Sequence, residues 1–303
     1  MPNFTRQTPH APTTHMTHSA TDVRLTEPVG TRALPARRST AIITAETALR
    51  ASAALWFGVA VIGQWTFVSY ILGFYASSAS RGAWSEWKKI LTHGIVPGDT
   101  MGNAALVAHI FLAVIITVGG PLQLVPALRA RAPSFHRWNG RVYLTTAFAS
   151  GISGLYMIWV GGIGGSLAQR VGISVDALLI MTFAVVAVRY ALARNMRLHR
   201  RWALRLFMVV SASWFFRVGL MFWIAVNHGP AGFDPKTFRG PFIDVLSFAQ
   251  YLVPLAVLEI YLRTRDRAGS PRRYAMAGSL LVLTAAMGLG IVVATKVMWL
   301  PRM

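Results

Sequence analysis

The stretch "GNAALVAHIFLAVIITVGGPLQLVPAL", residues 102–128, decides the fold class of this chain. It contains no Asp, Glu, Lys or Arg, and about 20 apolar residues are enough for a helix to cross roughly 30 Å of hydrocarbon. Further apolar stretches of comparable length follow and precede it. We therefore expect an all-α, polytopic membrane protein with about seven transmembrane helices, near residues 51–75, 102–128, 135–162, 173–193, 202–227, 244–262 and 274–299.

The composition of the whole chain supports this class. Of its 303 residues 54% are hydrophobic and 13% are charged, with a mean hydropathy of +0.48, which is typical of multi-pass membrane proteins. The chain has no cysteine, which excludes disulfides, thiolate metal sites and covalently attached c-type haem.

The positive charge is unevenly distributed. The net charge is +20, and 21 of the 30 Lys and Arg residues fall within residues 1–50, 128–141, 189–205 and 263–273, on one side of the predicted membrane. Because Lys and Arg in short loops favour the cytoplasm, we expect the amino terminus inside and the carboxyl terminus outside. Topology and attraction to anionic lipids account for the charge, so no nucleic-acid partner is expected.

The amino-terminal segment differs from the rest in composition. Residues 1–40 are rich in Thr, Pro, Ala and His and have almost no apolar run, so they cannot bury enough surface to fold. We expect a disordered cytoplasmic tail over residues 1–40 and a transmembrane helical domain over residues 41–303.

Two predicted helices begin with the same residue pair. "HRWNGRVY" starts at His136 and "HRRWALRLF" starts at His199, and Arg141 aligns with Arg205 after one inserted residue. This match predicts a core of two repeated helical hairpins, the second and third helices and the fourth and fifth. Parallel repeats are related by an axis along the membrane normal. The two His-Arg helix starts would therefore face each other at the cytoplasmic edge.

This inner site can be interpreted in two ways. Its candidate residues are His136, Arg137, Arg141, His199, Arg200, Arg205 and Gln123. In the first interpretation, one b-type haem is ligated through its iron by His136 and His199, while arginines hold its propionates, in a redox-type membrane protein. The first-turn position of the histidines counts against it, since bundle haems usually lie deeper.

In the second interpretation, the protein is a non-enzymatic binder or transporter, and the same residues capture an anionic lipid or small solute. Helix amino termini with clustered arginines are favourable for anions. The two histidines can also be ordinary interfacial residues, and positive-inside statistics alone can explain the arginines. The sequence leaves these alternatives open.

A second polar set lies inside the predicted membrane. Arg217 interrupts the fifth span, and an arginine in hydrocarbon needs a partner. Residues at comparable depth on other helices are His109, Asp176, Gln250, Gln64 and Asp244, while Glu259 lies closer to the inner site. We expect either a functional intramembrane site or a structural arginine neutralised by an aspartate.

Several of these motifs together resemble a known family. "AHIFLAVIITVGGPLQ", "FHRWNGRVY", "HRRWALRLF", "FFRVG" and Glu259 resemble the bacterial membrane-protein family named domain of unknown function 2306, over roughly residues 50–265. The resemblance implies a polytopic protein of the bacterial inner membrane and no assigned reaction. Paired histidines on a membrane helix bundle are also distantly similar to cytochrome b and ferric reductase haem bundles, by analogy alone.

Overall fold

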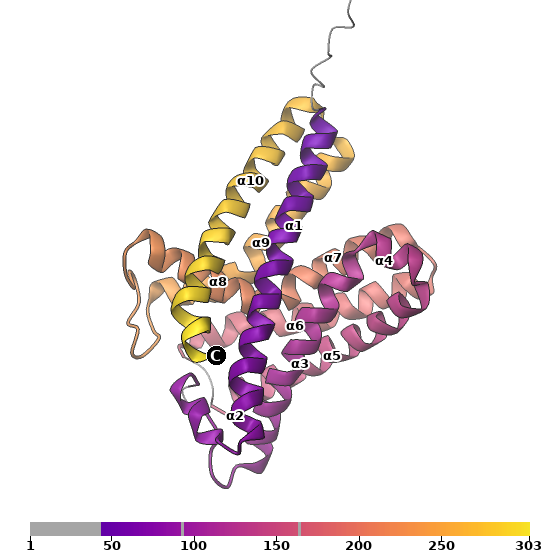
Figure 1. Ribbon diagram of the computed structural model, residues 1–303. Helices are drawn as coiled ribbons and strands as arrows, with labels where there is room; N and C mark the ends of the chain where they lie inside the picture. Colours follow the sequence, from indigo (N-terminus) through magenta and orange to yellow (C-terminus); the bar gives the residue numbers. More distant parts are fainter. Residues whose placement is uncertain (1–43, 92–93, 163–164) are drawn as a thin grey trace, which may run out of the picture. The chain divides into compact units, whose positions relative to one another are not determined.

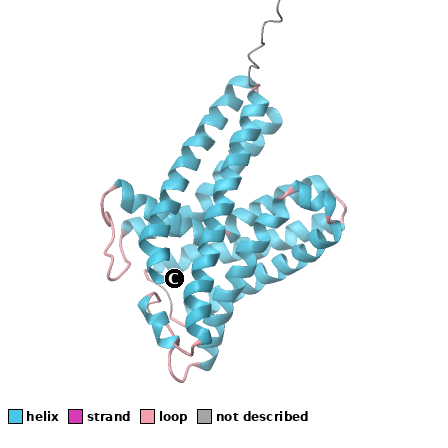
Figure 2. Cartoon of the chain, viewed as in Figure 1, coloured by secondary structure: helices cyan, strands magenta, loops and turns pink. Residues whose placement is uncertain are grey.

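The computed structural model describes residues 44–91, 94–162 and 165–303; the tail predicted for residues 1–40 lies outside them. The described residues form helices and no β-strand, apart from one isolated bridge between Asp234 and Arg239 (Figure 2). The all-α prediction is therefore confirmed.

The long helices match the predicted spans closely. In the described chain, six helical segments are long and apolar enough to cross a membrane, and a bent helix pair makes a seventh if it counts as one span. The long helices are α1 (Ala45–Tyr70), α3 (Thr100–Leu124), α5 (Pro133–Trp159), α6 (Leu167–Leu192), α9 (Pro241–Arg267) and α10 (Ser270–Val293) (Figure 1).

Shorter helices extend or connect them. The bent pair consists of α7 (Met196–Val210) and α8 (Ala212–Val226). The π-helical η1 (Ile71–Ala76) and then α2 (Ser77–Ser80) continue α1, and η3 (Ala294–Trp299) and η4 (Leu300–Arg302) continue α10. The connections contain η2 (Trp84–Lys89) and α4 (Pro126–Arg131).

Local sequence explains where the helices start. Thr44, Asp99, Ser166 and Asn195 each accept a hydrogen bond from a backbone N–H in the first turn of α1, α3, α6 and α7, as N-cap residues do. The helices α5, α9 and α10 have proline in the first turn instead, where its missing N–H is not needed. The spans therefore begin at residues suited to helix starts.

The predicted fifth helix, 202–227, is broken in the structure. α7 and α8 meet at Ser211 with a bend of 53°. The buried Gln64 of α1 donates a hydrogen bond of 3.0 Å from Nε2 to the Ser211 hydroxyl. α7 packs against α6 and α9, whereas α8 packs against α10 and α9. The predicted span is therefore present as a bent pair of helices, and a polar contact in the bundle interior accompanies the bend.

The bend also bears on the predicted repeat of two hairpins. His136 and His199 are each the fourth residue of their helix, α5 and α7, so the helix starts correspond. α5 continues unbroken along α3 and α6, while α8 turns away from α6 toward α10. The predicted repeat of two hairpins is therefore not confirmed.

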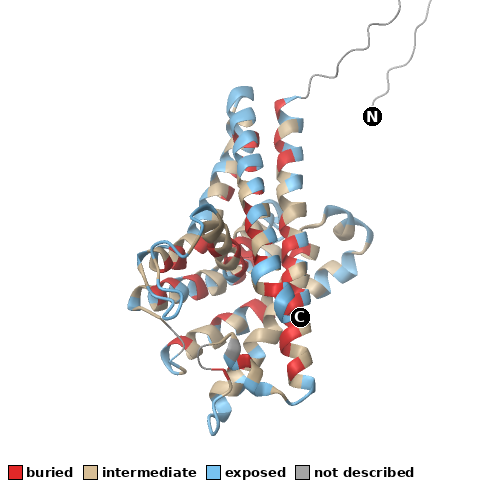
Figure 3. Cartoon of the chain, turned by 60° about the vertical axis from the view of Figure 1, so that its left-hand side comes forward, coloured by how far each residue is buried: buried red, intermediate tan, exposed pale blue. Residues whose placement is uncertain are grey.

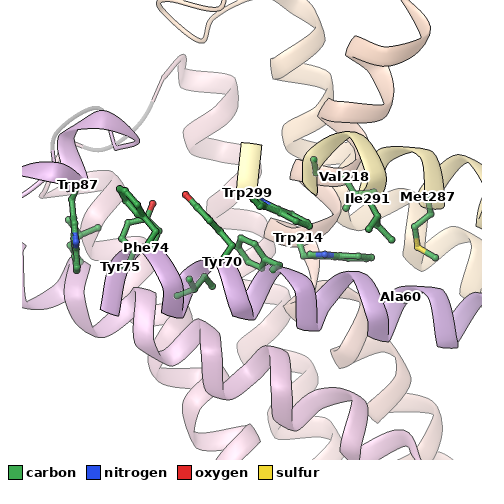
Figure 4. Close-up of a cluster of buried hydrophobic side chains, with 14 residues drawn as sticks. Ala60, Tyr70, Phe74, Tyr75, Trp87, Trp214, Val218, Met287, Ile291 and Trp299 are labelled. Carbon is green, nitrogen blue, oxygen red and sulfur yellow. The ribbon is translucent and has the colours of Figure 1, made fainter. Parts of the chain in front are cut away.

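Close contacts hold α1, α8 and α10 together. A Cβ at Gly63 would lie 2.8 Å from the Trp214 ring, and a Cβ at Gly290 would collide with the Val218 carbonyl oxygen. Trp214 and Val218 belong to a large buried cluster that extends along α1 to Trp87 (Figure 4). These glycines allow the close backbone approach that membrane helix packing uses.

Large apolar side chains also cover much of the outside. Leu192, Val282 and Leu167 are 80%, 70% and 69% exposed, and buried residues alternate with exposed ones along the long helices (Figure 3). A surface of exposed leucine and valine suits hydrocarbon rather than water. Together with the length of the helices, it identifies a multi-pass membrane protein that contacts the lipid bilayer.

Candidate functional site

The two histidines predicted as iron ligands lie near each other. His136 is within electrostatic range of His199, as it is of Arg129 and Arg137. His199 donates a hydrogen bond of 2.9 Å from Nδ1 to the carbonyl oxygen of Ala187 on α6. The Nδ1 atom of His136 is buried and has no hydrogen-bond partner among the described residues. The structure therefore brings this pair together at the starts of α5 and α7.

The arginines predicted beside the histidines mostly face outward. Arg137, Arg141 and Arg200 are exposed, and Arg137 donates to the Ser134 hydroxyl at 3.1 Å. Gln123 does reach the site, where its Nε2 donates to the carbonyl oxygen of His136 at 3.1 Å. Exposed arginines at helix ends suit lipid headgroups.

Arg205 behaves differently and pairs with a carboxylate. Its Nε and Nη2 atoms donate to the two oxygens of Glu259 at 2.7 and 3.0 Å, and its guanidinium lies 4.7 Å from the Trp202 ring centroid. The side chains of Arg205 and Glu259 are 19% and 33% exposed. Because this bidentate pair joins α7 to α9, the charge of Arg205 is already neutralised.

A large cavity lies beside these two helices. Its volume is about 510 Å³, within the usual range for small-molecule sites. The lining residues come mainly from α1, α7, α8, α9 and α10, and those on α9 run from Ala249 to Arg265, about 24 Å at 1.5 Å per residue. The cavity is therefore long and parallel to α9.

The lining of this cavity is almost wholly apolar. Gln250, Tyr261 and Arg265 are the polar lining residues, and the Nε2 atom of Gln250 already donates to the Ser247 carbonyl at 2.8 Å. The apolar lining includes Trp56, Phe57, Leu124, Leu204, Phe207, Met208, Phe215, Val218, Phe222, Val253, Val257, Leu258, Leu280, Leu283 and Met287. Neither His136 nor His199 lines it.

Arg265 lines one end of the cavity, and a small group of charged residues is connected to it. Asp266 accepts from Arg201 of α7 at 2.9 Å and from Arg265 at 3.1 Å. Arg273 of α10 donates to the Arg265 carbonyl at 3.3 Å, and its Nε atom is buried without a partner among the described residues. We call Arg201, Arg265, Asp266 and Arg273 the basic mouth. It has three positive charges and one negative charge.

The second polar set is dispersed in the structure. Asp244 accepts from Ser166 and Gln169. Asp176 is 9% exposed, and its Oδ1 atom has no hydrogen-bond partner in the described chain. Neither aspartate forms an ion pair with Arg217 among the described residues.

Arg217 lies in other surroundings. Its guanidinium lies 5.0 Å from the Phe67 ring centroid, and it interacts electrostatically with His109. Of the partners considered from the sequence, His109 is thus the one it approaches. After the bend at Ser211, α8 packs mainly against α10 and α9.

Sequence reasoning missed the cavity and its basic mouth. Arg201, Arg265 and Arg273 lie within clusters of positive charge that are typical of segments that set membrane orientation. The sequence feature that could have indicated the mouth is the carboxylate in "RTRDR", residues 263–267, because an aspartate among arginines contributes little to membrane orientation. The cavity itself depends on helix rotations that an apolar pattern does not fix.

The comparisons with known proteins support a membrane-protein family. No curated protein and no solved structure matches the chain. A family model described as "Predicted membrane protein (DUF2306)" matches residues 106–262, from α3 to α9. The match includes both His-Arg helix starts, the Arg205–Glu259 pair and most of the α9 wall of the cavity. The chain belongs to the DUF2306 family of predicted membrane proteins.

Proposed function

We propose that this protein binds an anionic amphiphile, with its apolar chain in the 510 Å³ cavity and its anionic headgroup at the basic mouth. The basic end of the helices faces the cytoplasm of a bacterial inner membrane in this proposal, in accord with the charge asymmetry. The observation that supports it best is the continuity of an apolar cavity with a cationic end, since Arg265 lines the cavity and belongs to the mouth.

The apolar cavity and the basic mouth contribute to binding in different ways. Lipid tails are as apolar as the cavity wall, so transfer of an alkyl chain from the bilayer gains no hydrophobic free energy. Shape and dispersion contacts along α9 favour a chain of matching length. Affinity for one headgroup over another then comes from the mouth, where the buried Nε atom of Arg273 has no acceptor and an anionic oxygen would provide one.

The net charge of the mouth supports an anion rather than a neutral headgroup. Asp266 compensates one of the three arginines. The Arg265 side chain is 47% exposed, so its attraction for an anion is partly screened. Amphiphiles with a carboxylate or phosphate head fit this arrangement, because arginine pairs with both groups.

A b-type haem is the second candidate. It is supported by His199, whose Nδ1 atom donates to the Ala187 carbonyl and so leaves Nε2 free, as in many metal-bound histidines. The amphiphile is better supported because the cavity does not reach the histidines and Arg205 already pairs with Glu259. A Soret absorbance in purified protein, lost in both His136→Ala and His199→Ala, would favour haem.

The proposal is tested by binding of a named probe. Cis-parinaric acid is a fluorescent fatty acid with a carboxylate head, and its fluorescence rises when the chain enters an apolar site. We expect saturable binding to the protein in nanodiscs, weakened about 3- to 10-fold by Arg265→Gln, since a partly exposed ionic contact contributes about 1 kcal/mol.

The matched control is Arg263→Gln. Arg263 is exposed on the same helix and does not line the cavity, so its loss removes the same charge from the surface and leaves binding unchanged. Equal weakening by both substitutions would show a general effect of surface charge and would contradict the proposed headgroup site.

A further inference from the structure

Arg217 lies inside the bundle without a carboxylate partner. Its Nη1 atom donates to the Ser213 carbonyl on the same helix at 2.6 Å, and its guanidinium lies 5.0 Å from the centroid of the Phe67 ring. Among the described residues, no Asp or Glu side chain forms an ion pair with it. These two contacts stabilise the cation weakly and leave most of its five N–H donors uncommitted.

Two phenols lie close to this arginine. Tyr70 and Tyr75 are 3% and 5% exposed, and their rings meet edge-on with centroids 5.9 Å apart. Both phenols interact electrostatically with Arg217. Each phenol carries a hydroxyl proton that it can donate to an acceptor. Arg302, at the end of the last helix, also interacts electrostatically with both phenols, so a second positive charge is near.

An indole provides a further donor in the same cluster. Trp299 is 0% exposed, and its Nε1 atom has no hydrogen-bond partner in the described chain. Its ring lies 5.4 Å from Phe67 and 6.5 Å from Tyr70, centroid to centroid, and Figure 4 shows Trp299 beside Tyr70 on the same side of α1. An indole N–H can only donate, and leaving it buried and unpaired costs about 1–3 kcal/mol.

Around Arg217, hydrogen-bond donors and positive charges therefore outnumber hydrogen-bond acceptors. We propose that Arg217, Tyr70, Tyr75 and Trp299 form a binding site for a compact monovalent anion, either a halide ion or the carboxylate of a small solute. Such an anion compensates the charge of Arg217 and accepts from the phenol and the indole. None of the four lines the large cavity, so this site is distinct from the one proposed for the amphiphile.

The test uses the full chain in detergent and named anions. The unfolding midpoint is followed by intrinsic fluorescence in potassium gluconate, whose anion is bulky, while chloride or formate replaces gluconate at constant ionic strength. The two arms distinguish a halide from a carboxylate. We expect the midpoint to rise saturably with at least one of them, because an anion that binds only the folded protein stabilises it.

Substitutions tie this response to the cluster. Arg217→Gln should abolish the rise, while Lys296→Gln, which removes an exposed charge near Trp299, should keep it. Tyr70→Phe keeps the ring and removes one donor, so the half-saturating concentration should increase about tenfold, as for a lost hydrogen bond to a charged group.

A wild-type midpoint that does not respond to chloride or formate would overturn the proposal. A response that persists in Arg217→Gln would do the same. If Arg217→Gln does not fold, Tyr70→Phe decides: an unchanged half-saturating concentration contradicts the site, and a clear increase supports it.

Discussion

Removal of the carboxylate of Glu259 should destabilise the contact between α7 and α9. Glu259→Gln keeps the shape of the side chain and leaves Arg205 without a counter-charge. Breaking a fully buried ion pair costs about 3–5 kcal/mol, and an exposed pair contributes about 0–1 kcal/mol. The two side chains are 33% and 19% exposed, so we expect an intermediate loss of about 2–3 kcal/mol.

The loss can be measured as the free energy of unfolding in mixed micelles titrated with SDS. A double-mutant cycle with Arg205→Gln isolates the pair, and the double substitution Arg205→Met with Glu259→Met should recover much of the loss, because no buried charge remains unpaired. Glu46→Gln is the control, since the Glu46–Arg50 pair is 55% and 75% exposed. A Glu259→Gln loss no larger than the control's would refute the reasoning.

Three further outcomes follow from the structure. Gly290→Ala should lower the free energy of unfolding by about 1–3 kcal/mol, because its Cβ would collide with the Val218 carbonyl; Gly288→Ala, with no atom within 4 Å of the added Cβ, should have no such cost in the same SDS titration. Asp176→Asn should not lower the free energy of unfolding, because no cation of the described chain forms an ion pair with that carboxyl; a large loss would show a missed partner. A reporter enzyme fused after residue 303 should be active outside the cytoplasm, and activity only inside would contradict seven spans with an inner amino terminus.

The membrane spans could be predicted from the sequence because the bilayer imposes both length and composition. Residues 102–128 had to form a helix, since a long uncharged segment has no other way to satisfy its backbone in hydrocarbon. The structure confirms this with α3, although that helix ends at Leu124 and α4 begins at Pro126. Proline in the first turn of the short helix accounts for the earlier break.

The break between α7 and α8 could not be predicted in the same way. "VVSASWFF", residues 209–216, contains no proline or glycine, so local propensity gives no reason to stop a helix there. The bend occurs where the Ser211 hydroxyl accepts from Gln64, 147 positions earlier in the chain. A contact at this separation depends on how α1 is placed against the bundle.

The candidate sites, like the helices, could be predicted from the sequence only in part. The depth of Glu259 suggested that it lies near the inner arginines, and its carboxylate does pair with Arg205. The surroundings of Arg217 depended on helix rotation, and a single unaligned sequence does not contain this information. The cavity could not be predicted either, because its lining residues have the same apolar side chains as residues that face lipid. Only the rotation of each helix about its axis distinguishes the two groups.

The most direct test is to fill the cavity and measure what the protein retains. Ala286 lines the cavity, whereas its neighbour Ala285 is exposed and does not, so Ala286→Phe and Ala285→Phe add the same bulk in different places. The proteins are purified from membranes in mild detergent, and their bound amphiphiles are extracted and counted by mass spectrometry. The proposal predicts about one anionic amphiphile per chain in the wild type and in Ala285→Phe, and a clear loss in folded Ala286→Phe. Equal retention in all three proteins, or none in the wild type, would contradict it.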